Sequence, residues 1–328
     1  MVRPQGSGLR FRAVLALVLL AVYFQFSETV PTAQPASPQI VPDIALVTNT
    51  TPQVTRISVP AAAPLPNFSV PRSVDTVAFA PDGRYAYFTS TESMPGSPFG
   101  GIVVWDATTS TVTGNIPIAL PAAVGASPNG QFIVAAGRTF PGGPGELTML
   151  DAGSFATLRT IQLTGIPTPV AVSLDNVRAF VTTSSPDALL RVDLFDGSMT
   201  SFDVGSNPHA VAVGPEGLFV YAASDTGISI VPVSASSVYG QIPLAVENAT
   251  PEAGDIAVSP DGRFGYVTAR DGYLHVLDLQ QQADVNRVQI GSGTSQTSLA
   301  LSHDGDKAIV TIYNQSRVAV VSTDSLTV

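Results

Sequence analysis

Asp75, His209 and Asp255 are the residues whose types and spacing could do chemistry. Each lies six or seven residues before the centre of a recurring turn, and Thr168 has the same position in a fourth unit. Two carboxylates and an imidazole can ligate a divalent cation or hold a cationic or hydroxyl-rich ligand. The same side chains could instead cap strand ends and meet water, since a metal normally needs three or four convergent ligands. Whether a metal binds here is left open.

The other chemistry-bearing residues give little support for catalysis. His275 lies in an expected outer strand and His303 in a turn, where packing or surface roles are expected. No histidine has a neighbouring Ser or Asp that suggests a nucleophilic triad. The chain has no Cys, which excludes thiol catalysis, iron–sulfur clusters and covalently attached c-type haem. We therefore expect no catalytic residue and no cofactor.

The turn that positions these residues recurs along the chain. Its copies are Pro81–Gly83, Pro128–Gly130, Leu174–Asn176, Pro215–Gly217, Pro260–Gly262 and His303–Gly305. The spacings between their central residues are 47, 46, 41, 45 and 43. A period of about 40–50 residues that carries only strand signals is typical of propeller blades.

Each repeat predicts four antiparallel strands. Small and β-branched residues such as Ala210–Val213 precede the turn and suit an inner strand. An apolar strand like Phe264–Ala269 follows, then an alternating strand like Tyr273–Asp278 and a more polar fourth strand. Residues 44–59 add a further second and third strand. We therefore predict an all-β fold over residues 44–328, a β-propeller of seven four-stranded blades with an irregular terminal seam; six or eight blades are the alternatives.

Three segments resemble the YVTN-type β-propeller repeat, a family found in surface-layer and other exported prokaryotic proteins. They are Ala45–Asn49, Ile102–Asp106 and Val258–Thr268. The resemblance covers residues 44–328 and implies a propeller. It implies no shared chemistry, because the repeat residues are blade-building ones. Leu174 in place of the turn proline departs from the family pattern.

Trp105-Asp106 is also similar to the dipeptide of WD-repeat propellers. The aspartates at this repeat position are Asp106, Asp151, Asp193 and Asp278. An Asp here can bond the backbone of the turn that follows, so we expect a structural role.

Two loops between second and third strands are longer than their counterparts. They are Glu92–Gly101 and Phe140–Glu146, in adjacent blades, so they should emerge side by side on one rim. Their apolar residues are Met94, Pro98, Phe99 and Phe140. Such a patch could contact a protein or a polymer, while simple length drift between repeats is the alternative.

Residues 1–33 have the pattern of a signal peptide or signal anchor. Three arginines precede the apolar run Ala13–Phe26, which at 14 residues is shorter than the roughly 20 of a membrane span. Ala33 offers a cleavage site, but Pro31 before it is unfavourable, so an uncleaved N-terminal membrane tether is the alternative. Residues 29–43, rich in Pro and Ala, predict a spacer. We expect a secreted, periplasmic or cell-surface protein.

The amino-acid composition restricts the classes of partner that this chain is expected to bind. The net charge of −10, with 15 basic against 25 acidic residues, disfavours nucleic acid, which needs clustered Lys and Arg. The hydrophobic fraction of 45% is ample for a core and excludes a disordered chain. We expect a monomer whose partner is a protein or a cell-envelope polymer.

These observations favour an exported, non-catalytic propeller that serves as a binding or scaffold module for a protein, glycan or cell-envelope partner. One alternative is a lactonase-like hydrolase with a channel-mouth metal on Asp75, His209 and Asp255, by fold analogy alone. Another is the propeller subunit of a periplasmic dehydrogenase whose redox cofactor lies on another chain.

Overall fold

Side chains within each recurring turn stabilise it by hydrogen bonds to the backbone of the same turn. In the turn at Ser259–Arg263, the Gly262 N–H donates to the Ser259 carbonyl (2.8 Å), and Gly262 has a φ of 72°. Asp261 Oδ1 accepts the Arg263 N–H (3.0 Å), and Ser259 Oγ accepts the Phe264 N–H (2.9 Å). This left-handed geometry favours glycine, and in the degenerate copy Asn176 adopts it with a φ of 61°.

The computed structural model describes residues 44–48, 51–246, 252–292, 297–312 and 315–328. Contacts divide the chain into Met1–Ile40 and Val41–Val328, and only the second unit contains described residues. The expected signal segment and the whole of the expected spacer, residues 29–43, therefore lie outside the described residues. Within the described part we find no helix with the length and hydropathy needed to span a membrane.

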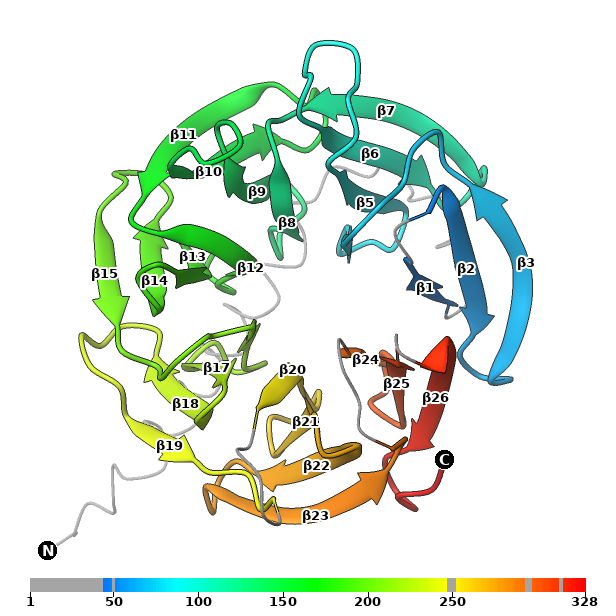
Figure 1. The fold of residues 1–328 in the computed structure, drawn as a ribbon, viewed down its shortest axis with the longest axis vertical. Helices are drawn as coiled ribbons and strands as arrows, with labels where there is room; N and C mark the ends of the chain where they lie inside the picture. The colour runs from blue at the N-terminus through cyan, green and yellow to red at the C-terminus, as the bar shows by residue number, and fades with distance from the viewer. Residues whose placement is uncertain (1–43, 49–50, 247–251, 293–296, 313–314) are drawn as a thin grey trace, which may run out of the picture. The chain divides into compact units, whose positions relative to one another are not determined.

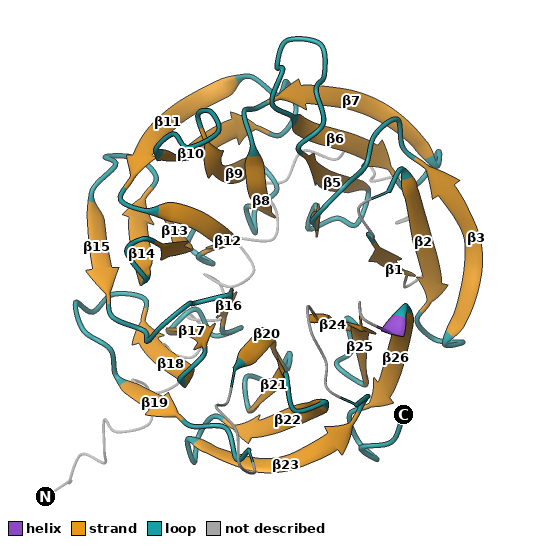
Figure 2. Ribbon diagram, viewed as in Figure 1, coloured by secondary structure: helices purple, strands orange, loops and turns teal. Residues whose placement is uncertain are grey.

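The unit Val41–Val328 is a ring of seven antiparallel sheets, a β-propeller, and strands supply its regular structure (Figures 1 and 2). Five sheets have four strands and two have three.

The first four sheets contain β1(Ile44–Val47), β2(Gln53–Ser58) and β3(Ala63–Ser69); β4(Val77–Phe79), β5(Tyr85–Ser90), β6(Gly101–Asp106) and β7(Thr111–Pro117); β8(Pro121–Ala126), β9(Phe132–Arg138), β10(Gly145–Asp151) and β11(Thr157–Leu163); and β12(Ile166–Val172), β13(Arg178–Ser184), β14(Ala188–Asp193) and β15(Met199–Phe202). The last three contain β16(Ala210–Val213), β17(Phe219–Ser224), β18(Gly227–Pro232) and β19(Gly240–Ile242); β20(Ala253–Val258), β21(Phe264–Ala269), β22(Tyr273–Asp278) and β23(Ala283–Gln289); and β24(Thr297–Leu301), β25(Lys307–Ile312) and β26(Arg317–Ser322). We number these sheets blades 1 to 7.

Every blade has two ends with different connections. One end carries the Pro-Asp-Gly turns and the turns after the third strands, and we call it the turn side. The opposite end carries the loops after the second strands and the segments that lead into the next inner strand, and we call it the mouth side.

The core lies mainly between neighbouring blades. The middle strands of each blade are its most buried ones; all six residues of β6 are buried, for example. Apolar residues from adjacent blades then form shared clusters, such as the one that joins Val134 of blade 3 to Leu194 of blade 4. Burial of these faces against each other is the main force that closes the ring.

The two three-stranded blades meet at the seam. Blade 1 has no inner strand among the described residues, and blade 7 has no outer strand there. Across the seam, Lys307 Nζ donates to the carbonyls of Val59 (2.7 Å) and Pro60 (2.6 Å). The predicted β-propeller of seven blades with an irregular terminal seam is therefore confirmed, and among the described residues the two blades at the seam have three strands each.

Candidate functional site

The residues expected at the channel mouth do lie on the mouth side of their blades. Asp75 and His209 precede the inner strands β4 and β16, while Thr168 and Asp255 lie within β12 and β20. Because these four inner strands belong to four blades, the side chains are distributed around the ring. Their hydrogen bonds show what each is able to do.

Asp255 links two blades through its carboxylate. Oδ1 accepts the N–H of Ile256 (2.8 Å), and Oδ2 accepts the N–H of Leu299 in the inner strand of blade 7 (2.8 Å). The Asp255 N–H in turn donates to Thr268 Oγ1 (2.8 Å). Burial raises the pKa of Asp255 to about 6, although the two backbone donors act in the opposite direction. Both carboxylate oxygens are therefore engaged within the fold.

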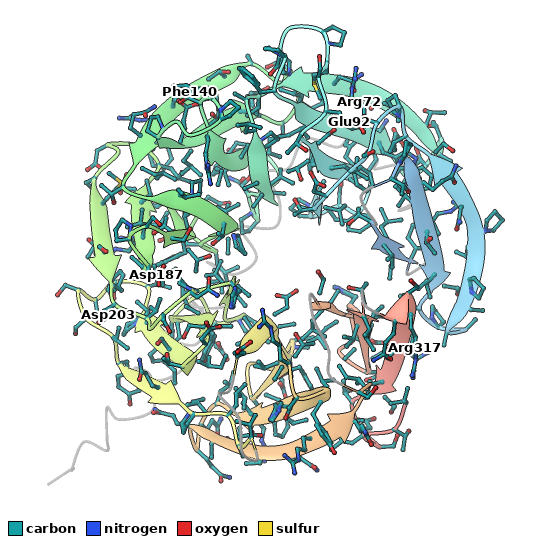
Figure 3. All side chains as sticks on the ribbon, viewed as in Figure 1. Arg72, Glu92, Phe140, Asp187, Asp203 and Arg317 are labelled. Atoms are coloured by element: carbon teal, nitrogen blue, oxygen red, sulfur yellow. The ribbon has the colours of Figure 1, made fainter. Side chains whose placement is uncertain are left out.

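His209 is paired with an aspartate that the sequence reading missed. Its Nε2 lies 2.9 Å from Asp225 Oδ1, and both side chains are about a third exposed. Asn207 Nδ2 donates to the other oxygen of Asp225 (3.3 Å), and the Asn207 N–H donates to Asp187 Oδ2 (2.9 Å). In Figure 3 the labelled side chains of Asp187 and Asp203 lie in the same part of the ring, at the left of the view. The sequence carries one indication of this pair. His209 precedes the first strand of a hairpin and Asp225 follows its second strand, so both lie on the mouth side.

Thr168 joins the inner strand of blade 4 to the second strand of the same blade. Its Oγ1 lies 2.8 Å from Thr182 Oγ1 and also donates to the Thr182 carbonyl (3.0 Å). In two other blades the threonine of the second strand accepts a backbone N–H of the inner segment: the Thr76 N–H donates to Thr89 Oγ1 and the Ser298 N–H donates to Thr311 Oγ1, both at 3.0 Å. The threonine of the repeat thus fastens the inner strand to the second strand.

Asp75 has a partly buried carboxyl. Burial raises its pKa, a hydrogen bond from the Thr91 side chain lowers it, and the nearby charge of Glu92 raises it again. Its backbone carbonyl accepts the hydroxyl of Thr48 from blade 1 (2.8 Å). Asp75 therefore joins the first two blades at the mouth and contacts the start of the long loop.

No group of three or more His, Cys, Asp or Glu side chains that could hold a metal occurs within the described ranges. A metal on Asp75, His209 and Asp255 thus remains a prediction from the sequence. Metal analysis of the purified protein and of an Asp255→Ala variant is its test.

Of the remaining histidines, His303 lies in a turn as predicted, while His275 lies in a middle strand of blade 6 and not in the expected outer strand. His275 in β22 is fully buried, with Nδ1 2.7 Å from Asp284 Oδ2 and Nε2 3.0 Å from Asp271 Oδ2. His303 lies exposed in its turn. Both ring nitrogens of His275 are engaged, so this imidazole has no free lone pair for a ligand.

The aspartates that end the third strands are structural, as predicted. Asp106 Oδ1 accepts the N–H groups of Thr108 (2.8 Å) and Thr109 (3.2 Å), and Asp278 Oδ1 binds its following turn in the same way. These hydrogen bonds, with the side chains of Thr108 and Arg84, lower the pKa of Asp106 despite its burial. The carboxylates are committed to turn formation.

The two long loops lie side by side on the mouth side. The Leu120 N–H donates to the Phe99 carbonyl (2.9 Å), and the Leu120 carbonyl accepts the Arg138 N–H (3.2 Å). Leu120 thus connects the loop at 91–100 to the end of β9, where the loop at 139–144 begins. At the base of the first loop, Arg72 donates to the Ser93 carbonyl, and Figure 3 shows Arg72 close to Glu92.

One of the four expected contact residues is not on the surface. Met94 is 5% exposed, because its backbone bridges to Ser97 and its side chain packs against Gly101. Pro98, Phe99 and Phe140 are exposed, at 36% for Phe99 and 52% for Phe140. The contact patch therefore consists of these three residues, which we call the loop rim.

Comparisons with known proteins agree on the fold. The family model described as the cytochrome D1 heme domain matches residues 214–328. The solved structure of hydrazine synthase from Kuenenia stuttgartiensis is 19% identical with a TM-score of 0.71, and the match covers 86% of this chain and 92% of that one. A functionally unknown protein from Desulfotomaculum acetoxidans DSM 771 is 17% identical with a TM-score of 0.71, covering 86% of this chain and 93% of that one. No curated protein matches the chain.

These likenesses show a β-propeller and do not show the YVTN-type family that the repeat segments resemble. At such identities a structural match carries the fold alone. The D1 family model matches the last blades and not the whole ring, so it stands as a similarity.

Proposed function

We propose that this chain is an exported, non-catalytic propeller that binds a protein or cell-envelope partner through the loop rim. The observation that carries the proposal is the exposure of Phe99 and Phe140 on two extended, adjacent loops. Aromatic side chains held on a rigid framework are frequent anchors of interfaces, because each buries a large apolar area at low conformational cost.

The loop rim is built to hold its anchors in place. Gly100 has a φ of 120°, and a Cβ at this position would lie 2.2 Å from the Ser90 carbonyl oxygen. Buried Met94 fills the interior of the loop, and Leu120 fastens Phe99 to the neighbouring blade. Loops that are rigid before binding lose little conformational entropy when a partner binds, which increases the affinity for that partner.

The hydrogen bonds of the described residues on the mouth side favour a binding role over a catalytic one. The carboxylate of Asp255 accepts two backbone N–H groups, and Thr168 braces a blade. His209 and Asp225 form the one exposed His–Asp pair that we find among the described residues, and no Ser, Thr or Cys nucleophile hydrogen-bonds that imidazole there. A nucleophile hydrogen-bonded to its base is the geometry that covalent catalysis requires.

The test is capture of partners from envelope extract. The wild-type chain should retain a defined partner that is lost when both loops are shortened to the length of their counterparts. A double variant, Phe99→Ser with Phe140→Ser, should weaken retention by at least tenfold, as loss of two aromatic anchors implies. Retention of the same partner by both variants would refute the proposal.

A second candidate is a propeller module of a redox assembly. The D1 family model over residues 214–328 and the hydrazine synthase fold favour it. An axial ligand of a haem needs a free imidazole nitrogen or a comparable donor, and His209 already has its Nε2 paired with Asp225. His275 has both nitrogens engaged, and His303 lies in an exposed turn at the turn side.

In this second candidate the redox group therefore belongs to another chain. A partner captured from extract should then show the visible absorption of a haem protein, while the isolated propeller should show none. A captured partner without visible absorption would contradict this candidate and leave the first one standing.

A further inference from the structure

Six blade junctions on the turn side share one pair of positions. A residue of the second strand meets the residue that follows the third strand of the next blade. The pairs that share a buried cluster are Val134 with Leu194, Phe180 with Val233 and Tyr221 with Leu279. At the junction between blades 6 and 7, Tyr266 hydrogen-bonds the side chain of Thr323. A large or hydrogen-bonding partner thus fills each of these four junctions.

The junction between blades 2 and 3 differs. Here Tyr87 takes the second-strand position, and the residue after the third strand is the small Ala152. A pocket of about 370 Å³ opens between them, within the size range of small-molecule sites. The first junction also has an alanine, Ala107, but Leu46 opposite it offers no polar atom. The combination of a tyrosine and a missing side chain is found only at this junction among the described blades.

Polar groups converge on this pocket. Tyr87 is 2% exposed and lines the pocket. Burial, followed by the charges of Asp82 and Tyr85, raises the pKa of Tyr87 to about 12, so its phenol can both donate and accept at neutral pH. Asp82 also lines the pocket, and only its Oδ1 is engaged there, by the Arg84 N–H (2.9 Å).

The lining of the pocket is mixed. Pro81, Pro128 and Ala152 make part of it apolar, and Asp82 and Asn129 make part of it polar. The Arg84 guanidinium lies 4.9 Å from the centroid of the Tyr85 ring and bonds Asp106 Oδ2 (3.2 Å). One face of that ring is therefore taken by a cation, and a second cation would be repelled. No Lys or Arg lines the pocket to hold an anion.

We propose that this pocket binds a neutral, hydroxyl-rich ring, that is, a sugar residue. A carboxylate and a phenol can bind adjacent hydroxyl groups, while prolines and tyrosines pack against the C–H face of a ring. The site lies on the turn side, at the opposite end of the blades from the loop rim. It is therefore independent of the function proposed above.

The test is saturation-transfer NMR with free glucose, galactose, mannose and N-acetylglucosamine as probes, and n-butylammonium as a cationic probe. At least one sugar should receive magnetisation from the wild-type protein. Ala152→Leu places in this junction the residue type found as Leu194 and Leu279 in two of the others, and should abolish the transfer while the thermal midpoint is kept. Tyr87→Phe should weaken binding about fivefold, as loss of one hydrogen bond implies.

Tyr221→Phe is the matched control, because it removes the equivalent hydroxyl from a junction that Leu279 fills. Its sugar signal should equal that of the wild-type protein. Absence of transfer to all four sugars would overturn the proposal, as would a sugar signal that Ala152→Leu does not change. Transfer to butylammonium in place of the sugars would also overturn it. Tyr87→Phe keeps the question decidable if Ala152→Leu fails to fold.

Discussion

At the scale of single residues, His275 is a fully buried imidazole between two carboxylates. Burial alone would lower its pKa, but the hydrogen bond and charge of Asp284 and then of Asp271 raise the pKa above 6.5. Asp284 also accepts the Ala245 N–H from the segment after β19 (2.8 Å), so the cluster ties blade 6 to its neighbour. The protonated form is the one that the fold stabilises.

We predict that His275→Gln lowers the free energy of unfolding by about 3–5 kcal/mol at pH 6, because two largely buried carboxylates lose their cation. A group with a raised folded-state pKa contributes its stability fully below its unfolded pKa and loses it as pH rises through the folded pKa. The cost should therefore shrink above that pKa. Urea denaturation at pH 6 and pH 9 is the measurement, with His303→Gln as the exposed control. Equal costs at both pH values would contradict the charged state.

Burial raises the pKa of the Asp255 carboxyl group, whereas it acts to lower the pKa of the His275 imidazole. The Asp255 pKa of about 6 in the folded state exceeds the ordinary 3.8, so folding favours the protonated form. The stability from this group is present below pH 3.8 and is lost as pH rises to about 6. Between pH 4 and pH 7 the wild-type protein should therefore lose on the order of 2 kcal/mol relative to Asp255→Asn. Parallel stability curves for the two proteins would show that the carboxyl titrates normally.

At the scale of elements, the seam depends on the one lysine of the chain. Lys307 begins β25 and donates to two carbonyls of the β2–β3 turn, 247 and 248 residues away. Inner strands of the other blades contact one another around the ring, and here a side chain adds the connection between first and last blades. Hydrogen bonds from a charged donor are worth more than neutral ones.

We predict that Lys307→Met destabilises the protein by about 1.5–3 kcal/mol, the range for hydrogen bonds to charged groups. Arg317→Met removes a positive charge from an exposed position of the same blade and should cost less than about 0.5 kcal/mol. Thermal and urea unfolding of both variants is the check. Equal stability of the two variants would mean that the seam is closed by apolar packing alone.

The sequence predicts well what depends on local periodicity. Turn positions, strand order, seven blades and the capping role of residues such as Asp106 follow from spacing within one repeat. Pairings across blades could not be read in this way, because the partners are separated by a repeat or by most of the chain. The Lys307 seam contact and the Ala152 pocket are of this kind, and the burial of Met94 depends on how one loop folds back.

At the scale of the whole molecule, the two ends of the ring differ in character. The turn side is built from repeated hydrogen-bonded turns and contains the pocket beside Tyr87. The mouth side carries the loop rim and a carboxylate-rich region around Asp187 and Asp225, in a chain with a net charge of −10. Such a charge on the binding end favours partners with a basic surface over acidic polymers.

Site-specific photo-crosslinking tests the loop rim most directly. A benzoylphenylalanine in place of Phe140 should form one defined adduct with a partner in envelope extract. The same probe in place of Phe195, which is 61% exposed on the turn side, should form none. Adducts of equal yield from both positions, or from neither, would contradict a partner-binding surface at the loop rim.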